Sequence, residues 1–211
     1  MTVKAKICGL TDAPTLDAAV RAGAGYVGFM FFPPSPRAIR PEQAAPLVRS
    51  VPEQVQSVGV FVDPDDALLD RVLAEVPLDM LQLHGDEPVD RVAAIKAKTG
   101  LPVMKVFKIA EAEDFQPARR FEPVVDYLMF DAKPPKGSDR PGGNAVAFDW
   151  ALMRGQSWSK PWFLAGGLTA DNVKGAVKLT GARLVDTSSG VEDAPGRKNP
   201  EKIRRFLSQL A

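Results

Sequence analysis

Short apolar runs alternate along the whole chain with segments in which apolar residues recur every three or four positions. Several of the runs are apolar throughout, which is typical of strands buried on both faces of a parallel sheet. The pattern predicts strands at 3–8, 25–31, 56–62, 79–83, 102–107, 126–130, 161–165 and 183–186. This alternation of strands and helices predicts an α/β fold.

The segments between these strands predict amphipathic helices, with apolar stripes through residues 16–23, 69–76 and 203–210. A shorter sixth helix is expected within 147–153. Typical helix-start residues support the pattern. They are Thr11 or Asp12 before the first helix, Pro41 and Glu42 at the second, and Thr169 or Asp171 before the seventh.

Eight strand–helix pairs in 211 residues match the count of a compact (β/α)8, or TIM, barrel. An open doubly wound sheet shows the same alternation but usually has fewer strands. No composition shift or low-complexity linker divides the chain, so we expect a single barrel domain over residues 1–211.

The charge balance and the cysteine content exclude several classes of protein. Lys and Arg (27) nearly balance Asp and Glu (26), so the chain lacks the basic surface typical of nucleic-acid binding. No apolar run approaches the ~18 residues of a membrane-spanning helix, and the N-terminus lacks the pattern of a secretory signal. One cysteine cannot form an internal disulfide. We expect a cytoplasmic monomer or homodimer without membrane or nucleic-acid partners.

In a TIM barrel the loops that follow the strands form the active face, so residues at the ends of the predicted strands are candidates for a site. In chain order they are Cys8, Arg37, His84, Asp131, Gly166 and Gly167, and Asp186 to Gly190.

The loops after the seventh and eighth strands are suited to a phosphate group. "LAGGLTADNV" contains Gly166 and Gly167, and "VDTSSGVEDAPG" contains Ser188, Ser189 and Gly190. Glycines let the backbone approach a ligand closely, the hydroxyls add donors, and the second loop could start a short extra helix. Glycine and serine are also ordinary turn residues, so either loop alone could be a tight turn. Together, after strands seven and eight, they favour a phosphate site on the C-terminal face of the barrel.

The motifs together resemble one family, phosphoribosylanthranilate isomerase. The resemblance is carried by "KICGLT", "GYVGFMFFPPSPRAI", "VGVFV", "LQLHGDE", "FDAKPP", "GGNAVAFDW", "LAGGLTADNV" and "VDTSSGVEDAPGRKNPEKI". These motifs span essentially the whole chain, in order and at barrel spacing. One stretch departs from the family: residues 144–147, Asn-Ala-Val-Ala, replace a polar Gly-Lys-Thr-like element.

The resemblance implies an Amadori rearrangement, which converts the phosphosugar N-(5-phosphoribosyl)anthranilate to 1-(2-carboxyphenylamino)-1-deoxyribulose 5-phosphate without a metal or organic cofactor. It implies a base at Cys8 and an acid at Asp131. A free thiol titrates at about 8.5, and helix N-termini, Lys or Arg near Cys8 could lower its pKa, but the sequence does not show such a shift. A partly desolvated carboxyl holds its proton to higher pH, which suits an acid.

Each catalytic candidate also has an ordinary structural interpretation. Most free cysteines are small buried hydrophobic residues, and an Asp before "AKPP" could cap a turn. Lys6, on the first strand, could enter the barrel or be structural.

Two further residues are candidates for substrate binding. The resemblance implies that Arg37 binds the anthranilate carboxylate, since a guanidinium offers two parallel donors. Arg37 could instead be a solvated loop charge, and Arg40 lies close enough to take its place. His84, the only histidine, could line the pocket or make a local hydrogen bond, but it cannot build a metal site alone.

Three other functions fit the sequence less well. A metal-dependent pentose epimerase needs paired histidines and acids at the strand ends. A two-substrate isomerase of the histidine and tryptophan pathways would carry aspartate in place of Cys8. A non-catalytic phosphosugar-binding subunit would not need both Cys8 and Asp131.

Overall fold

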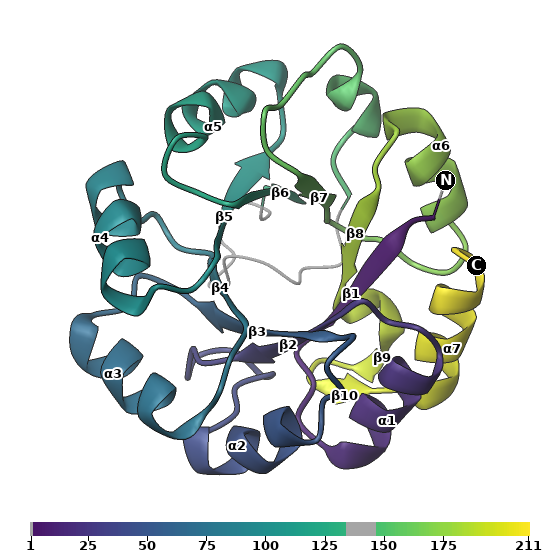
Figure 1. Cartoon of the computed structure of the whole chain (residues 1–211). Helices are drawn as coiled ribbons and strands as arrows, with labels where there is room; N and C mark the ends of the chain where they lie inside the picture. Colours follow the sequence, from purple (N-terminus) through teal and green to yellow (C-terminus); the bar gives the residue numbers. More distant parts are fainter. Residues whose placement is uncertain (1, 134–146) are drawn as a thin grey trace.

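The computed structural model describes residues 2–133 and 147–211, and in these residues eight parallel strands form a closed barrel (Figure 1). Consecutive strands pair with each other, and the last strand pairs with the first. The strands are β1 (Lys4–Cys8), β2 (Tyr26–Met30), β3 (Gln56–Phe61), β4 (Met80–Leu83), β5 (Val103–Ile109), β6 (Tyr127–Ala132), β7 (Trp162–Leu164) and β8 (Leu184–Thr187). All the expected strands are confirmed, and with them the TIM barrel.

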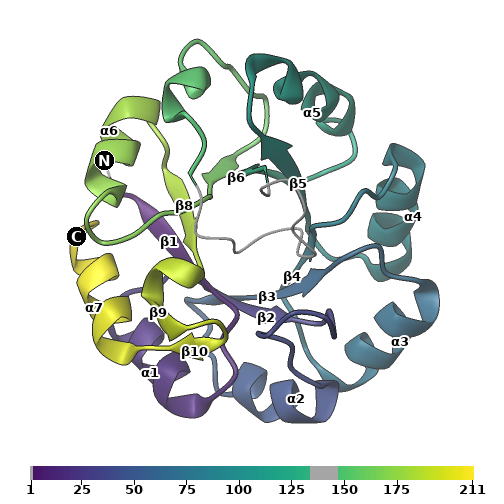
Figure 2. The ribbon, with the colours of Figure 1, turned by 180° about the vertical axis from the view of Figure 1, so that it is seen from behind.

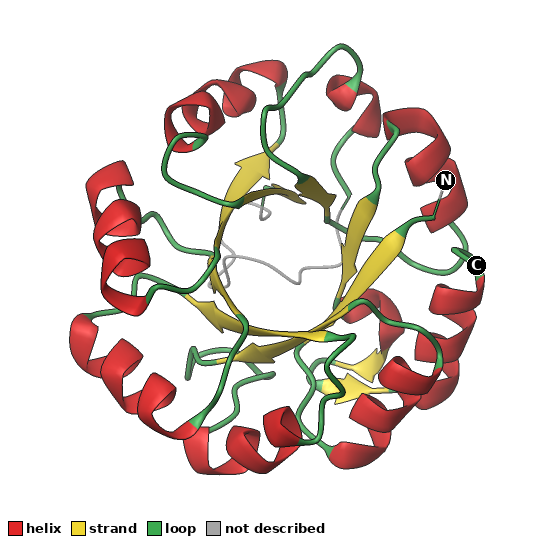
Figure 3. Cartoon of the chain, viewed as in Figure 1, coloured by secondary structure: helices red, strands yellow, loops and turns green. Residues whose placement is uncertain are grey.

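Helices surround the barrel and cover the outer face of the strands (Figure 3). They are α1 (Ala13–Arg21), α2 (Pro41–Arg49), α3 (Asp66–Glu75), α4 (Val89–Thr99), α5 (Gln116–Phe121), α6 (Val173–Thr180) and α7 (Pro200–Ser208), with 3-10 turns η1 (Ala112–Phe115), η2 (Trp150–Met153) and η3 (Ser189–Val191). Within the part of the chain that the structure describes, no helix is both long and apolar enough to cross a bilayer.

The helix-start predictions were correct at the first two helices and wrong later in the chain. Asp12 caps α1, because its Oδ1 accepts the Thr15 N–H at 2.9 Å, and α2 begins at Pro41. The seventh helix was expected to follow Thr169 or Asp171 directly. Instead α6 starts at Val173, because the Asn172 side chain accepts the Thr169 N–H at 2.8 Å and closes a turn before it.

The short sixth helix expected within 147–153 is present as a single 3-10 turn, η2, and not as an α-helix. Asp149 Oδ1 accepts the Ala151 N–H at 2.9 Å, which tightens the start of this turn. The chain then leaves at Arg154 in an extended conformation and cannot continue an α-helix. Most of the divergent stretch, residues 144–146, lies outside the described residues.

Alternate residues of each strand face the barrel interior and the helix layer. Ile7 packs in the core between strands and helices, so Lys6 and Cys8 on either side of it face the interior. The lower part of the interior is filled by an apolar cluster of Tyr26, Val58, Met80, Met104, Val106, Met129, Phe163 and Ala165. The polar interior residues therefore gather toward the C-terminal ends of the strands.

A small antiparallel hairpin follows β8 and was not predicted from the sequence. Its strands, β9 (Glu192–Ala194) and β10 (Arg197–Lys198), lie beside α1 and α7 (Figure 2). The hairpin brings charged side chains to the end of β1.

Candidate active site

Cys8 and Asp131 lie at the same rim of the barrel, near the ends of β1 and β6. The strand order β6-β7-β8-β1 separates them by three steps around the ring. Both are buried, Cys8 at 5% and Asp131 at 8% exposure. A thiol and a carboxyl can therefore act from different sides of one ligand in the barrel mouth.

The Cys8 thiol is packed against a buried ion pair. Lys6 Nζ lies 2.8 Å from Asp186 Oδ1, and the Lys6 side chain is fully buried. Burial raises the pKa of the Cys8 thiol, although the charge of Lys6 and its hydrogen bond to the thiol act in the opposite direction. Lysines near the thiol therefore do act to lower its pKa, but desolvation outweighs them.

A second cation, Lys198 of β10, ties the hairpin to the end of β1. Its Nζ donates to the Ser188 carbonyl and to Ser188 Oγ, both at 3.2 Å, and Ser188 Oγ donates to the Cys8 carbonyl at 3.0 Å. Burial lowers the pKa of Lys198 even though Glu192 acts to raise it. Ser188, predicted as a substrate-binding residue, is thus connected to the backbone of Cys8.

Arg37 makes a buried bidentate ion pair with Glu192. Its Nε and Nη2 lie 2.7 Å and 2.8 Å from the two carboxylate oxygens, and both side chains are 4% exposed. Although burial opposes it, hydrogen bonds from Arg37 and the charge of Lys198 hold the pKa of Glu192 below its usual value. Arg40, by contrast, pairs with Glu42 on the surface with its side chain 71% exposed. Arg37 is therefore not a solvated loop charge.

On the other side of the mouth, Asp131 is held by backbone and by His84. Its Oδ1 accepts the Ala132 N–H at 2.8 Å, and its Oδ2 lies 3.4 Å from His84 Nε2. The amide nitrogen of buried Gln82 lies 3.1 Å from His84 Nδ1. When this amide donates, Nδ1 is an acceptor and a neutral ring carries its proton on Nε2, facing Asp131.

Gly166 and Gly167, after β7, adopt left-handed backbone conformations with φ of +85° and +63°. A Cβ at Gly166 would lie 2.7 Å from the Ala132 nitrogen and 3.2 Å from Asp131 Oδ1. Only glycine therefore lets this loop pass so close to the carboxyl group.

The loops after β7 and β8 are joined to each other. Thr187 Oγ1 donates to the Leu168 carbonyl at 2.7 Å, and a Cβ at Gly190 would lie 2.0 Å from the same oxygen. Ser189 opens η3, so the expected short extra helix is confirmed as a 3-10 turn. Both predicted phosphate loops thus line one segment of the rim.

Sequence reasoning missed three charged or polar members of the site: Gln82, Glu192 and Lys198. Gln82 had a detectable signal, since it lies two residues before His84 and so on the same face of its strand. Glu192 and Lys198 had none, because only the fold of the hairpin brings them to the barrel.

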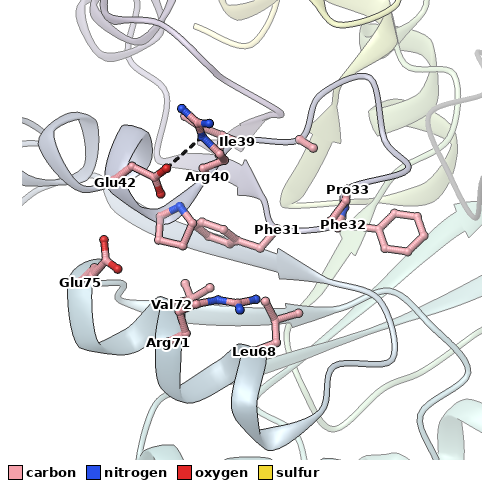
Figure 4. A pocket seen from close by; sticks show the side chains of 12 residues that line it. Phe31, Phe32, Pro33, Ile39, Arg40, Glu42, Leu68, Arg71, Val72 and Glu75 are labelled. Atoms are coloured by element: carbon pink, nitrogen blue, oxygen red, sulfur yellow. Dashed lines mark ion pairs between the residues drawn. The ribbon is translucent and has the colours of Figure 1, made fainter.

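No group of three or more His, Cys, Asp or Glu side chains that could hold a metal ion occurs in residues 2–133 and 147–211. An apolar hollow of about 420 Å³ lies between α2 and α3, lined by residues such as Phe31, Ile39 and Val72 (Figure 4). It lies on the outer side of the barrel wall, and of the candidate residues it is lined only by Arg40, the alternative to Arg37.

Comparison with known proteins gives consistent matches over nearly the whole chain. The family model for N-(5'-phosphoribosyl)anthranilate (PRA) isomerase matches residues 5–209. The N-(5'-phosphoribosyl)anthranilate isomerase of Paramagnetospirillum magneticum is 56% identical over 207 residues, covering 98% of this chain and 96% of that protein.

Solved structures of the same kind of enzyme superpose closely. Phosphoribosyl anthranilate isomerase in complex with reduced 1-(o-carboxyphenylamino)-1-deoxyribulose 5-phosphate has a TM-score of 0.82 at 31% identity, covering 99% of this chain and 98% of that one. A monomeric form of the dimeric Thermotoga maritima enzyme has a TM-score of 0.82 at 32% identity, with the same coverage.

Proposed function

This chain belongs to the N-(5'-phosphoribosyl)anthranilate isomerase family, and from that premise we propose that Cys8 is the base and Asp131 the acid of its reaction. The protein is an isomerase of tryptophan biosynthesis, which rearranges N-(5-phosphoribosyl)anthranilate to 1-(2-carboxyphenylamino)-1-deoxyribulose 5-phosphate. The assignment of the two roles rests on one observation: a buried thiol and a buried carboxyl lie at the ends of β1 and β6, three strands apart on one rim.

The rearrangement needs only proton transfers. Asp131 donates a proton to the furanose ring oxygen as its bond to C1 breaks, which leaves an open-chain Schiff base. The Cys8 thiolate then takes the proton from C2, and the electron pair forms the enolamine. Gain of a proton at C1 and loss of the hydroxyl proton at C2 give the ketone. An acid and a base side chain can carry out each of these steps, so no metal or organic cofactor is expected.

His84 is suited to assist the acid as well as to contact substrate. After Asp131 has given up its proton, a hydrogen-bond donor at His84 Nε2, 3.4 Å away, would stabilise the negative charge of its carboxylate. Gln82 keeps the ring in this orientation through its bond to Nδ1. His84 is therefore placed to donate to the Asp131 carboxylate once the proton has been given up.

Arg37 is proposed to bind the anthranilate carboxylate. Glu192 fixes the plane of its guanidinium through two short hydrogen bonds. A planar cation with a fixed orientation can recognise a second planar carboxylate with little further loss of side-chain entropy.

The loops at Gly166, Gly167, Ser188, Ser189 and Gly190 are proposed to bind the 5-phosphate. Support comes from the positive φ angles of the two glycines, the two hydroxyls and the contact that joins the loops. Their position after β7 and β8 matches the usual phosphate site of TIM barrels.

We further propose a single functional domain over residues 1–211 that acts in the cytoplasm as a monomer or homodimer. Its only expected partner is the small phosphosugar substrate, without nucleic acid or membrane. The near balance of 27 basic and 26 acidic residues supports the absence of nucleic-acid binding, and light scattering of the purified protein will determine the oligomeric state.

The direct test is a fluorescence assay that follows consumption of N-(5-phosphoribosyl)anthranilate by the purified chain and by Cys8→Ser. We expect turnover by the wild type, and a loss of at least about 100-fold in kcat for Cys8→Ser, the scale of general-base catalysis. Circular dichroism will show whether the variant keeps its fold. A folded variant with near-wild-type kcat would refute the assignment of the base.

A further inference from the structure

The Lys6–Asp186 ion pair lies beside the thiol and has no part in the acid–base steps above. Lys6 is two residues before Cys8 on the same face of β1, and Asp186 is its register partner on β8. Their charged atoms are 2.8 Å apart, with the Lys6 side chain 0% and the Asp186 side chain 11% exposed. The pair is therefore part of the barrel interior and not of the surface.

Lys6 and Cys8 share one small space that Gly28 leaves open. A Cβ at Gly28, the register partner of Cys8, would lie 3.0 Å from Lys6 Nζ and 3.1 Å from Cys8 Sγ. The ammonium and the thiol interact both by charge and by a hydrogen bond. The absence of a side chain at Gly28 lets the cation reach the sulfur.

Burying charges in a barrel interior costs free energy, because the apolar side chains that normally fill a TIM barrel cannot replace the lost contacts with water. The neighbouring interior residues here, such as Met80, Met104 and Phe163, follow that rule. An apolar residue at position 6 would fill the space without desolvating a charge. The ion pair thus calls for a role other than packing.

The other charged groups near the thiol do not take over this role. Lys198 also acts to lower the pKa of Cys8, but its effect is smaller than that of Lys6. Its ammonium group is bound to Ser188 and Glu192. Arg37 packs over Gly9 and is held by Glu192. Among the groups that the structure describes, Lys6 has the strongest lowering effect on the pKa of the thiol, which lies with it around the space at Gly28.

We propose that Lys6 and Asp186 are positioning residues that set the protonation state of Cys8: the Lys6 ammonium stabilises the thiolate, while Asp186 holds Lys6 in place and limits that stabilisation. The function of this pair rests on the proposed role of Cys8 as the base. Although burial opposes it, the charges of Asp186 and Cys8 raise the pKa of Lys6, so a cation lies beside the sulfur.

The proposal predicts opposite effects for the two members of the pair. Lys6→Met removes the cation and leaves the Asp186 anion, so the titration midpoint of the thiol should rise by about one pH unit or more. Asp186→Asn removes the anion and leaves the cation, so the midpoint should fall. One unit corresponds to about a tenfold change in thiolate fraction below the midpoint.

The chain has a single cysteine, so its thiolate absorbance in the ultraviolet reports one group. Each variant is titrated without substrate, and the absorbance of the same variant carrying Cys8→Ser is subtracted at each pH. Lys4→Met, an exposed lysine two residues earlier on β1, is the matched control and should leave the midpoint unchanged. Shifts in the same direction for both variants, or no shift, would mean that the pair is only structural and would overturn the proposal.

The pH profile of kcat/KM separates this proposal from the assignment of the base. If both are correct, the midpoint of the limb that rises with pH moves up in Lys6→Met and down in Asp186→Asn. If the titration midpoint of the thiol shifts while the pH profile of kcat/KM does not, the pair sets the pKa of Cys8, but Cys8 is not the base. Should Lys6→Met fail to fold, Asp186→Asn decides alone: a lowered midpoint supports the proposal, and an unchanged or raised one refutes it.

Discussion

Several charged or polar side chains at the mouth of this barrel are buried beside a partner. Lys6 has Asp186, Arg37 has Glu192, and His84 lies between Gln82 and Asp131. A buried charge without a partner is strongly destabilising, so each pair constrains which substitutions the chain tolerates. For a test of function, isosteric substitutions are therefore the most informative.

Asp131→Asn keeps the shape of the acid and removes its proton. We expect kcat to fall by at least about 100-fold, with KM changed much less, because the lost step is proton donation and not binding. Steady-state kinetics across a range of pH measure both parameters. An Asn variant with wild-type kcat would show that another group protonates the ring oxygen.

Arg37→Lys keeps the charge and removes the two parallel donors. We expect KM to rise about tenfold, equal to ~1.4 kcal/mol, with a smaller change in kcat. Arg40→Lys, at an exposed position three residues later, is the control and should behave like the wild type. Equal effects of the two substitutions would argue against a specific carboxylate contact at Arg37.

The sequence predicted those site residues that belong to strand ends, because the barrel fixes where each strand end lies. It did not predict their partners. Lys6 and Asp186 are 180 positions apart, and Arg37 and Glu192 are 155 apart. No local pattern links such pairs, and the pKa of Cys8 depends on them together with burial.

Among the secondary-structure elements, the strands were easier to predict than the short elements between them. Buried parallel strands have continuous apolar runs, so even β7, three residues long, was found. The strands of the hairpin, β9 and β10, are three and two residues long, mostly polar, and too short to show a clear period. The start of α6 was misplaced because Thr169, Asp171 and Asn172 are all typical helix-start residues, and side-chain hydrogen bonds decide among them.

The loop after β7 offers a test at the level of an element. Gly166→Ala puts a Cβ 2.7 Å from the Ala132 nitrogen in a backbone conformation with φ of +85°. We expect it to lower stability by about 1–3 kcal/mol and to lower kcat by displacing Asp131. Unfolding in urea and steady-state kinetics measure the two effects.

Gly181→Ala, at the C-terminal end of α6, is the matched control for Gly166→Ala. Its φ is +71°, but a Cβ there has no atom within 4 Å. Gly181→Ala should lose about 1 kcal/mol of stability, because alanine is strained in a left-handed backbone conformation, and it should keep wild-type kcat. Equal losses of kcat in the two variants would mean that the contact of Gly166 with the β6 end is unimportant.

For the whole molecule, the barrel decides where chemistry can take place. The closed ring of strands leaves no open edge, and the apolar cluster fills its lower interior. Charged residues from β1, β6, β8 and the hairpin then meet at the remaining end. The fold could be predicted because it follows from periodicity, whereas the balance of charges at the rim follows from contacts between distant segments.

This balance of charges gives a prediction for acid stability. The pKa of Glu192 is below its usual value in the folded protein, so its ionised form stabilises the fold above the unfolded pKa of about 4.3. That contribution is lost as the pH falls through the lower, folded pKa. Glu192→Gln should therefore be less stable than the wild type near neutral pH, where Arg37 and Lys198 lose their common partner, and the difference should shrink as the pH is lowered.

The measurement is the free energy of unfolding in urea for both proteins between about pH 7 and pH 3, a range that spans the ordinary carboxyl pKa values. Glu42→Gln removes an exposed carboxylate, so its curve of stability against pH should stay close to that of the wild type. If the curves of Glu192→Gln and wild type run parallel, the ion pair with Arg37 does not contribute to stability through its charge. The bidentate contact would then act only to orient Arg37, and the cost of Glu192→Gln would appear in KM instead of in the unfolding free energy.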